Sequence, residues 1–233
     1  MKSKLLKKVQ YIRADGELSP AGERIVKETA LKVIVDGRHF ATAMILAAME
    51  KEYITGLLYI HGFISRAADI VSVEIKNNIA DVKLNKDREK RPILQNINSN
   101  LIVCKEDVLN CVRAILKSPI FEETEAVHSA GLFLNAREVV SITEDLGRHN
   151  AFDKVIGAGL LKNIDFNKVL AASTGRQPVE MILKCRNAGI PIIATKGVPT
   201  SMAVELAEKT GITIAGQMRA DTMTVYSHPE RIE

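Results

Sequence analysis

Residues 168 to 216 read KVLAASTGRQPVEMILKCRNAGIPIIATKGVPTSMAVELAEKTGITIAG, and this stretch decides the fold. Short apolar runs alternate in it with longer segments of mixed polarity. The pattern predicts strands over 168–172, 191–195 and 212–215, and helices over 179–188 and 201–209. Strands that alternate with helices are typical of a parallel sheet covered by helices. The stretch therefore predicts a layered α/β fold.

The same alternation extends on both sides of this stretch. Upstream, a helix is predicted to begin near Glu106-Asp107, where acidic residues suit the positive end of the helix dipole. Further segments are predicted as strands over 131–134, 138–143 and 223–226, and as a helix over 152–161. We therefore predict one α/β domain over residues 101–233.

The amino-terminal part has a different pattern, with two strand pairs around one helix. Asp36-Gly37 separates runs over 31–35 and 40–45, and Asn77-Asn78 separates runs over 71–75 and 79–82. Both dipeptides favour tight hairpin turns. Apolar residues from 53 to 64 recur every three or four positions, which predicts a helix. We predict a small α+β domain over residues 1–100, with a basic amino-terminal arm and a polar linker over 85–100.

The composition is that of an ordinary globular protein, with 46% hydrophobic and 26% charged residues among 233. Three cysteines are too few for a disulfide scaffold and favour a reducing, intracellular setting. No signal peptide is visible, and no apolar run approaches the roughly 20 residues that span a bilayer. A net charge of only +4 and the absence of Trp disfavour general nucleic-acid binding. We expect a cytoplasmic protein that binds neither nucleic acid nor membranes.

Polar loops directly follow four of the predicted strands. Ligands of an open α/β sheet bind beyond the carboxyl ends of its strands, so these loops are the candidate site. Each supplies one basic residue near a Gly or near a helix that begins with Ser or Thr. These residues are Arg148, Arg176, Lys196 and Arg219. Backbone N–H groups at such positions attract anions, which predicts a phosphate-bearing ligand. The alternative is a set of ordinary surface loops, because these are also rich in Arg, Lys, Gly and Thr.

The first of these loops also holds side chains suited to acid–base chemistry. Glu144, Asp145 and His149 offer two carboxylates and an imidazole. The structural alternative is that Asp145 caps the following helix and that His149, beside it, only makes hydrogen bonds within the protein. His128 and His149 with a cysteine suggest zinc, but no Cys-x-x-Cys and no His-x-Glu occurs. We expect no metal site.

The three cysteines differ in their surroundings. Cys111 and Cys185 lie among apolar residues of predicted helices and are predicted to be core thiols. Cys104 precedes the acidic start of a helix, where a thiol can have a lowered pKa and become nucleophilic. Its neighbour Val103 fits burial equally well, so both interpretations of Cys104 stay open.

Several segments form a distinctive set of motifs. The two longest are EDLGRHNAFDKV over residues 144–155 and PTSMAVELAE over 199–208. Shorter ones are STGR at 173–176, GIPI at 189–192 and TVY at 224–226. Together they resemble the formate dehydrogenase accessory protein family, FdhD. The resemblance extends over nearly the whole chain from about Glu28 and is strongest from Thr124 to His228.

The resemblance implies both a fold and a function. In that family the carboxy-terminal domain has a cytidine-deaminase-like α/β/α fold without the zinc site. Its members are cytoplasmic sulfur carriers that accept sulfane sulfur from a cysteine desulfurase as a persulfide. They pass this sulfur to the bis-molybdopterin guanine dinucleotide molybdenum cofactor of formate dehydrogenase. The implied partners are therefore a cysteine desulfurase, apo-formate dehydrogenase and, in a homodimer, a second copy of the chain.

The resemblance also implies where the cofactor binds. Arg148, Arg176 and Arg219 are expected to position phosphates, and Asp221 to meet the guanine edge. The full set of expected cofactor-binding residues is Gln217, Met218, Arg219, Ala220, Asp221, Thr222, Arg176, Arg148, His149, His128 and Thr200.

The chain departs from the family pattern in two places. The family has a Cys-Gly-x-Cys-Gly loop before the helix near Glu106, whereas residues 95–104 contain one cysteine, Cys104, and no glycine. Residues 124–128 read TEAVH where the family has Thr-Gly-Gly before a hydrophobic residue and His. Loss of these glycines removes easy access to positive φ and adds an acid near the expected anion site.

Three functional hypotheses follow. In the first, the chain binds the cofactor and transfers sulfur, with Cys104 as the candidate persulfide, since thiolate attack needs one nucleophile. In the second, it holds the cofactor or an apo-oxidoreductase without covalent chemistry. In the third, it is a small-molecule enzyme that uses Glu144, Asp145 and His149.

Overall fold

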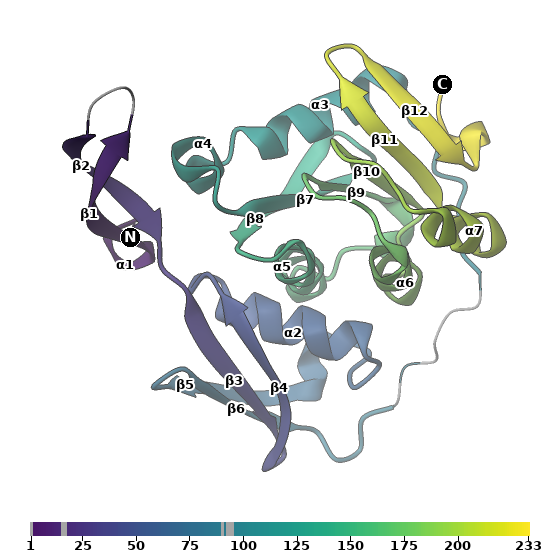
Figure 1. Cartoon of the computed structure of the whole chain (residues 1–233). Helices are drawn as coiled ribbons and strands as arrows, with labels where there is room; N and C mark the ends of the chain where they lie inside the picture. Colours follow the sequence, from purple (N-terminus) through teal and green to yellow (C-terminus); the bar gives the residue numbers. More distant parts are fainter. Residues whose placement is uncertain (1, 15–17, 90, 92–95) are drawn as a thin grey trace.

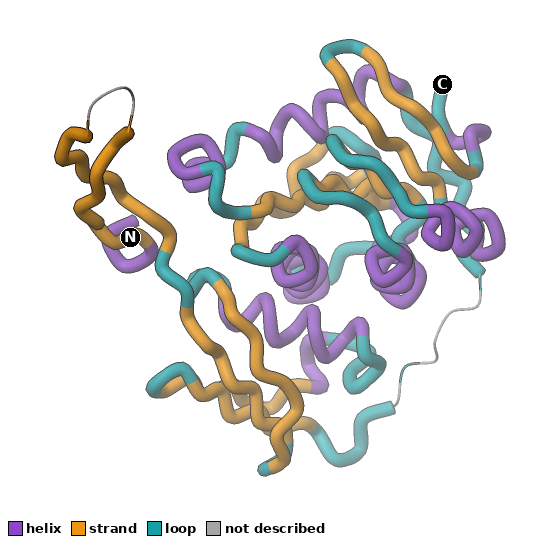
Figure 2. The backbone as a smooth tube through the Cα atoms, viewed as in Figure 1, coloured by secondary structure: helices purple, strands orange, loops and turns teal. Residues whose placement is uncertain are grey.

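The computed structural model describes residues 2–14, 18–89, 91 and 96–233 (Figure 1). Within these residues the strands form sheets of two, four and six strands. The six-stranded sheet comes from the second half of the chain, and the four-stranded sheet lies below it in the view of Figure 1. The two-stranded hairpin projects to one side (Figure 2).

The six-stranded sheet has the strand order β12-β11-β10-β9-β7-β8. β9, β10 and β11 are parallel, whereas β7, β8 and β12 pair antiparallel with their neighbours. The carboxyl ends of β8, β9, β10 and β11 therefore lie at one edge of the sheet, together with the start of β7. The bounds are β7 (His128–Leu134), β8 (Glu138–Asp145), β9 (Val169–Ser173), β10 (Ile192–Thr195), β11 (Thr213–Arg219) and β12 (Thr222–Ser227).

Helices cover both faces of this sheet. Side chains alternate along the strands, so Leu170 and Ala172 join one core whereas Val169 and Ala171 join the other. The first core lies under α3 (Lys105–Leu116), and the second under α5 (Arg148–Leu161), α6 (Val179–Ala188) and α7 (Ser201–Thr210) (Figure 2). The prediction of a mixed α/β fold is confirmed.

The four-stranded sheet has the order β4-β3-β6-β5. Its two hairpins turn where the sequence predicts, with φ of 49° at Asp36, 79° at Gly37, 50° at Asn77 and 60° at Asn78. These left-handed residues give the tight turns of hairpins. The bounds are β3 (Thr29–Val35), β4 (Arg38–Ile45), β5 (Ile70–Lys76) and β6 (Ile79–Leu84), with a short helix η1 (Ala67–Asp69) before β5.

The helix α2 (Glu50–Ile60) packs between this sheet and α5, and its backbone nearly touches that of α5. A Cβ atom added to Gly56 would lie 1.9 Å from the carbonyl oxygen of Asp153. One added to Gly157 would lie 1.8 Å from the carbonyl oxygen of Glu52. Glycine permits this approach because it has no side chain. One core thus runs through both parts of the chain, and the boundary between domains 1–100 and 101–233 stays a prediction.

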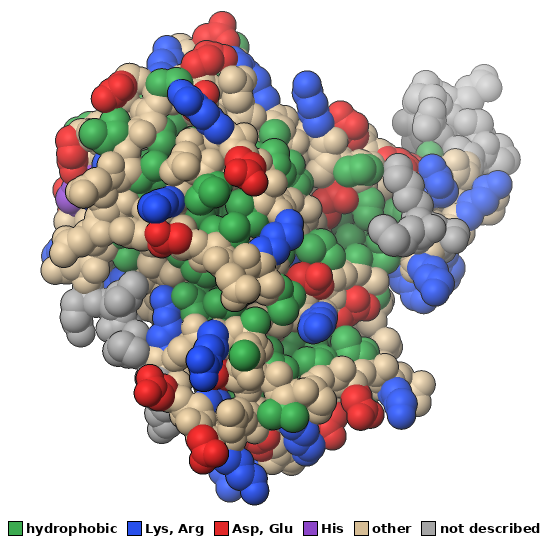
Figure 3. All heavy atoms as spheres, turned by 180° about the vertical axis from the view of Figure 1, so that it is seen from behind, with side chains coloured by type: hydrophobic (Ala, Val, Ile, Leu, Met, Phe, Trp, Pro, Cys, Tyr) green, Lys and Arg blue, Asp and Glu red, His purple; other side chains and the backbone are tan. Residues whose placement is uncertain are grey.

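The amino-terminal residues form a hairpin that the sequence pattern did not predict. The one-turn helix α1 (Lys2–Leu5) leads into β1 (Leu6–Ala14), which pairs antiparallel with β2 (Leu18–Val26). Leu5 and Leu6 bury themselves in a cluster with Leu46. The basic side chains visible on this hairpin at the right of Figure 3 fit the predicted basic arm, and exposed ones are Lys4, Lys7, Lys8, Arg24 and Lys27.

Other differences from the prediction are local. The short helix α4 (Pro119–Thr124) was not expected, and α5 begins at Arg148 rather than near residue 152. Short helices η2 (Phe166–Lys168) and η3 (Pro229–Arg231) complete the described elements. Of the predicted linker, the described residues between 85 and 100 form no helix or strand, and residues 90 and 92–95 lie outside the described part. None of the helices described is long and apolar enough to cross a membrane.

Candidate functional site

The edge of the six-stranded sheet where β8, β9, β10 and β11 end is named the rim. Residues 174–176 follow β9, residues 196–198 follow β10, and Arg219 ends β11. Because β7 runs in the opposite direction, its first residue, His128, lies at the same edge. The fold thus brings together the polar loops that the sequence predicts at the strand ends.

A cavity of about 560 Å³ opens at the rim, within the usual range of small-molecule sites, roughly 300–1,000 Å³. Three exposed basic side chains line it, Arg176, Lys196 and Arg219. Within the described part of the chain, none of the three has an ion-pair or hydrogen-bond partner for its side chain. The cavity therefore presents three positive charges that form no ion pair within the described residues.

The other end of the cavity, beside the start of β7 and the end of β8, is apolar and acidic. Phe121, Val127 and Leu146 supply apolar side chains there, and Glu125 supplies a carboxylate. Glu125 ends α4 with φ of 51°, in the left-handed region. That conformation costs a non-glycine residue roughly 1–2 kcal/mol. The cavity thus has a basic end and an apolar end that carries one acid.

A bulge in β11 places Gln217 and Arg219 at the cavity. The register between β11 and β12 shifts between Gly216 and Arg219, and Gln217 has φ of 52°. The Gln217 N–H donates to the carbonyl oxygen of Gly197 at 2.6 Å, and its side-chain Oε1 accepts from the Tyr226 hydroxyl at 3.3 Å. Bulges re-aim side chains and are common beside functional sites.

Arg148 packs against the loop after β9 without lining the cavity. A Cβ atom added to Gly175 would lie 2.9 Å from Arg148 Cδ and 3.4 Å from His128 Nδ1. Among the described atoms, Arg148 Nε is buried and has no hydrogen-bond partner. A buried donor left unpaired costs about 1–3 kcal/mol, so Arg148 Nε is an unfavourable feature of the described part of the chain.

His128 lines the cavity, and its Nδ1 lies 3.3 Å from Thr174 Oγ1. Burial, and then the positive charge of Arg148, lower the pKa of His128 below its ordinary value. The imidazole is therefore neutral at pH 7. An anion in the cavity would offset the charge of Arg148 and raise this pKa again.

Asp221, which is expected at the guanine edge, is paired with Arg113 in the structure. Asp221 Oδ1 accepts from Arg113 Nη2 at 2.8 Å, and the Ala220 carbonyl oxygen accepts from the same nitrogen at 3.1 Å. Arg113 lies on α3, so it draws the tip of the β11–β12 hairpin toward that helix. Asp221, Ala220 and Thr222 are not among the residues that line the cavity.

Three further expected residues also lie away from the cavity. Met218 is buried in the core under α3. Thr200 occupies the N-cap position of α7, and its backbone N–H donates to the Gln177 carbonyl oxygen at 3.1 Å. His149 lies in the first turn of α5, where burial and then the charge of Lys184 lower its pKa to about 4. Of the eleven expected binding residues, the cavity brings together His128, Arg176, Gln217 and Arg219.

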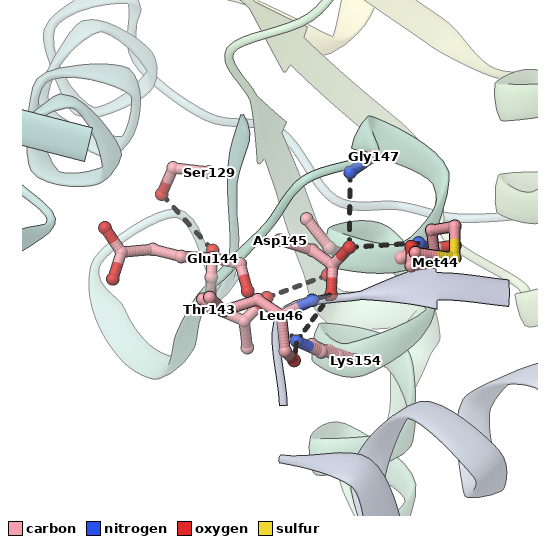
Figure 4. Close-up of polar contacts among 10 residues, drawn as sticks. Met44, Leu46, Ser129, Thr143, Glu144, Asp145, Gly147 and Lys154 are labelled. Carbon is pink, nitrogen blue, oxygen red and sulfur yellow. Dashed lines mark hydrogen bonds and ion pairs between the residues drawn. The ribbon is translucent and has the colours of Figure 1, made fainter. Parts of the chain in front are cut away.

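The carboxylates of Glu144 and Asp145 hold chain segments together. Glu144 Oε1 accepts from the backbone N–H groups of Ile120 and Phe121, each at 2.7 Å, and so satisfies the start of α4. Asp145 is fully buried, and its Oδ2 lies 2.6 Å from the buried Lys154 Nζ (Figure 4). Burial lowers the pKa of Lys154, and the charge of Asp145 opposes that shift.

This buried pair is fully hydrogen-bonded. Asp145 also accepts from the backbone N–H groups of Leu46 at 3.1 Å and Gly147 at 3.2 Å, and Lys154 donates to the carbonyl oxygens of Leu46 and Glu144 (Figure 4). The pair therefore fastens the end of β4 to β8 and α5. The structure does not bring the predicted acid–base side chains together around a ligand, because Glu144, Asp145 and His149 do not line the cavity.

The cysteines lie apart from the rim. Cys111 and Cys185 are buried, as predicted, and burial raises the pKa of Cys111 to about 12 and also raises that of Cys185. Cys104 is half-buried at the start of α3 and lines a second cavity of about 540 Å³ with Asn135 and Lys168. Asn135 follows β7 and Lys168 precedes β9, so Cys104 lies at the edge of the sheet opposite the rim. In the described part of the chain, no group of three or more His, Cys, Asp or Glu is placed to hold a metal ion.

Sequence reasoning missed the apolar wall of the rim cavity. Phe121 belongs to α4, whose six residues are too few to show a helical period. Leu146 is embedded in a polar loop, and no periodic signal distinguishes it there. Val127 precedes a predicted strand by several residues, so only the longer observed β7 places it at the rim.

Comparison with known proteins places this architecture in a family. The model of the FdhD/NarQ family matches residues 26–103 and 89–233. The sulfur carrier protein FdhD of Methanothermobacter thermautotrophicus is 30% identical, with 98% of this chain and 99% of that protein covered. The sulfur carrier protein FdhD of Sulfurisphaera tokodaii is 34% identical, with 84% and 86% covered.

A solved structure has the same fold. It is a crystal structure from Desulfotalea psychrophila, assigned as a formate dehydrogenase accessory protein, with a TM-score of 0.86 and 28% identity. The similarity covers 98% of this chain and 100% of that one. With the family match over most of its length, the chain belongs to the FdhD/NarQ family.

Proposed function

We propose that the chain is an accessory protein of formate dehydrogenase maturation that binds the guanine nucleotide end of a molybdenum cofactor in the rim cavity. The observation that carries this proposal is the convergence on one cavity of three basic side chains that have no partner among the described residues, Arg176, Lys196 and Arg219. The names of the relatives, sulfur carrier protein and formate dehydrogenase accessory protein, support the same role.

The residues present fit a ligand with several phosphates, such as bis-molybdopterin guanine dinucleotide. Arg176, Lys196 and Arg219 provide charge for phosphate oxygens. When bound, the cofactor would supply the molybdenum centre that receives sulfur. The side chains at the rim would hold its phosphates.

The layering around the six-stranded sheet supports the finer fold assignment. One helix, α3, covers one face, and α5, α6 and α7 cover the other. We assign this arrangement to the cytidine-deaminase-like α/β/α class that the family resemblance implies.

Sulfur carriage requires an accessible thiol, and we assign that role to Cys104, because Cys111 and Cys185 are buried. In the loading step the Cys104 thiolate attacks the sulfane sulfur of the persulfide on a cysteine desulfurase. The donor's S–S bond breaks, a new S–S bond forms at Cys104, and the donor cysteine leaves as a thiolate, so no oxidant is consumed.

A second candidate function is a cofactor holder without covalent chemistry. It is favoured by the position of Cys104 at the sheet edge opposite the rim, where the thiol does not line the ligand cavity. Replacement of Cys104 by Ser separates the two functions. Loss of cyanolysable sulfur after incubation with a desulfurase supports the carrier, and unchanged loading leaves the holder.

Ligand binding is tested by thermal unfolding in the presence of GDP, ATP or inorganic phosphate. A ligand that binds only the folded state raises Tm, so we expect GDP to stabilise the protein most. The Arg176→Ala variant should show a smaller shift with GDP. Absence of a shift at saturating GDP would contradict both candidate functions.

Cysteine desulfurase and apo-formate dehydrogenase are the proposed partners. A homodimer and a cytoplasmic location follow from the family resemblance alone and stay predictions.

A further inference from the structure

The rim cavity is polarised along the edge of the sheet. Its basic side chains come from the loops at the ends of β9, β10 and β11. Glu125 and the apolar residues Phe121, Val127 and Leu146 come from the segments beside β7 and β8, whereas Val198 is an apolar residue on the basic side. A ligand with an anionic part and a flat apolar part would match this division.

Glu125 is held at the apolar end by the backbone. It ends α4, its N–H donates to the carbonyl oxygen of Phe121 at 2.9 Å, and its φ of 51° turns the chain toward β7. In the described part of the chain its carboxylate forms no ion pair with the three cations of the same cavity. Its oxygens are therefore available as acceptors.

A carboxylate among apolar side chains discriminates between purine bases. An ionised carboxylate is an acceptor only, with two oxygens. The Watson–Crick edge of guanine offers two adjacent donors, N1–H and the 2-amino group, which such a carboxylate can accept together. Adenine presents an acceptor, N1, beside its amino group, and would face the carboxylate with one donor and one repelling lone pair.

We propose that Glu125 recognises the guanine base of the ligand while Arg176, Lys196 and Arg219 hold its phosphates. This inference rests on the proposed function, because it places a guanine nucleotide in the rim cavity. It moves base recognition from Asp221, which is paired with Arg113, to a residue on the opposite side of the rim. Glu125 would then be a specificity-determining residue.

The test is calorimetric titration of the whole protein with GDP, IDP, ADP and pyrophosphate. IDP lacks the 2-amino group, so wild type should bind GDP more tightly than IDP and ADP. In the Glu125→Gln variant, GDP binding should weaken about tenfold and the preference for GDP over IDP should vanish. Pyrophosphate should bind the variant at least as tightly, because one negative charge is removed.

Two matched variants serve as controls. Glu122→Gln makes the same change on α4 at an exposed residue outside the cavity, and Asp221→Asn removes the other candidate carboxylate. Both should retain the wild-type preference for GDP. If wild type binds GDP but the Glu125→Gln change alters the affinities for GDP and ADP by the same factor, the inference is overturned. The proposed function is not affected by that result. Wild type that binds neither GDP nor pyrophosphate overturns the proposed function and the inference together.

Discussion

Glu125 combines an unfavourable backbone conformation with a carboxylate in the rim cavity. Its φ of 51° lies where glycine is at ease and where the family resemblance implies a Thr-Gly-Gly sequence. Strain of this kind is commonly stored at functional sites. A glycine at residue 125 would therefore favour stability, whereas glutamate provides the carboxylate at the cost of an unfavourable backbone conformation.

We expect the Glu125→Gly variant to be more stable than wild type by about 0.5–1 kcal/mol, because glycine adopts the left-handed helix end without steric cost. The matched variant Glu122→Gly, within α4, should lose about 1 kcal/mol instead. Urea denaturation of the two variants measures both changes. A Glu125→Gly variant that is as destabilised as Glu122→Gly would show that the backbone is not strained at residue 125.

His149 predicts part of the pH dependence of stability. Its pKa falls from an ordinary 6.5 to about 4 in the folded protein, because burial and Lys184 disfavour the charged ring. Between these values the unfolded state binds more protons, so stability decreases as the pH is lowered through 6.5 toward 4. At pH 5 the loss is on the order of 1–2 kcal/mol after allowance for partial exposure.

The His149→Gln variant should lack this loss. The free energy of unfolding, measured in urea at pH 7 and pH 5, should fall less in the variant than in wild type. Equal losses in the two proteins would mean that His149 titrates alike in the folded and unfolded states.

At the scale of elements, α2 and α5 are in close backbone contact between the four-stranded and the six-stranded sheet. Gly157→Ala would place a methyl group 1.8 Å from the carbonyl oxygen of Glu52, so the helices would have to separate. We expect a loss of about 3 kcal/mol, at the upper end of overpacking costs. Thermal and urea unfolding of the variant measure it.

Gly159→Ala is the matched control on the same helix. Its added Cβ would meet side chains of Leu132 and Phe166 at 3.0 Å, and these can shift. It should cost clearly less than Gly157→Ala, because side chains can move aside whereas the backbone of α2 cannot; the gain of about 1 kcal/mol in helix propensity is common to both variants. Similar losses in both variants would contradict the inference of a backbone-to-backbone contact.

The elements differ in how far their sequences reveal them. The alternation from residue 131 onward and the turns at Asp36-Gly37 and Asn77-Asn78 are local signals, and the structure contains these strands, helices and turns. The hairpin of β1 and β2 lacks such a signal, because described residues on both of its faces are exposed and no apolar alternation arises. Asp145 has the polar character of a loop residue, but it ends β8 and is buried, because Lys154 of α5 and the backbone N–H of the distant Leu46 satisfy its carboxylate.

The candidate site was predictable only where it follows from the order of strands and helices. Arg176, Lys196 and Arg219 meet because the carboxyl ends of parallel strands share an edge, and this rule needs only the order of elements. The pairing of Asp221 with Arg113 joins residues 108 positions apart, and no local pattern predicts it. The place of Glu125 at the cavity depends on α4, which is too short for a periodic signal.

At the scale of the whole molecule, the small net charge does not reveal the cluster of positive charge at the rim cavity. The net charge is +4, and other basic side chains, such as Arg113 and Arg137, are paired with acids. The three cations of the rim cavity are unpaired within the described chain. Binding of an anion there should therefore weaken as ionic strength rises, since exposed charges are screened by salt.

The most direct test of this account is the affinity for GDP of wild type and of variants at the two cavities, measured by calorimetry at low salt. We predict saturable binding of one GDP per chain, weakened about tenfold by Arg176→Ala, Lys196→Ala or Arg219→Ala and unchanged by Arg137→Ala beside Cys104. Absence of GDP binding, or binding that Arg137→Ala weakens while the three rim variants leave it intact, would contradict the assignment of the rim cavity as the nucleotide site.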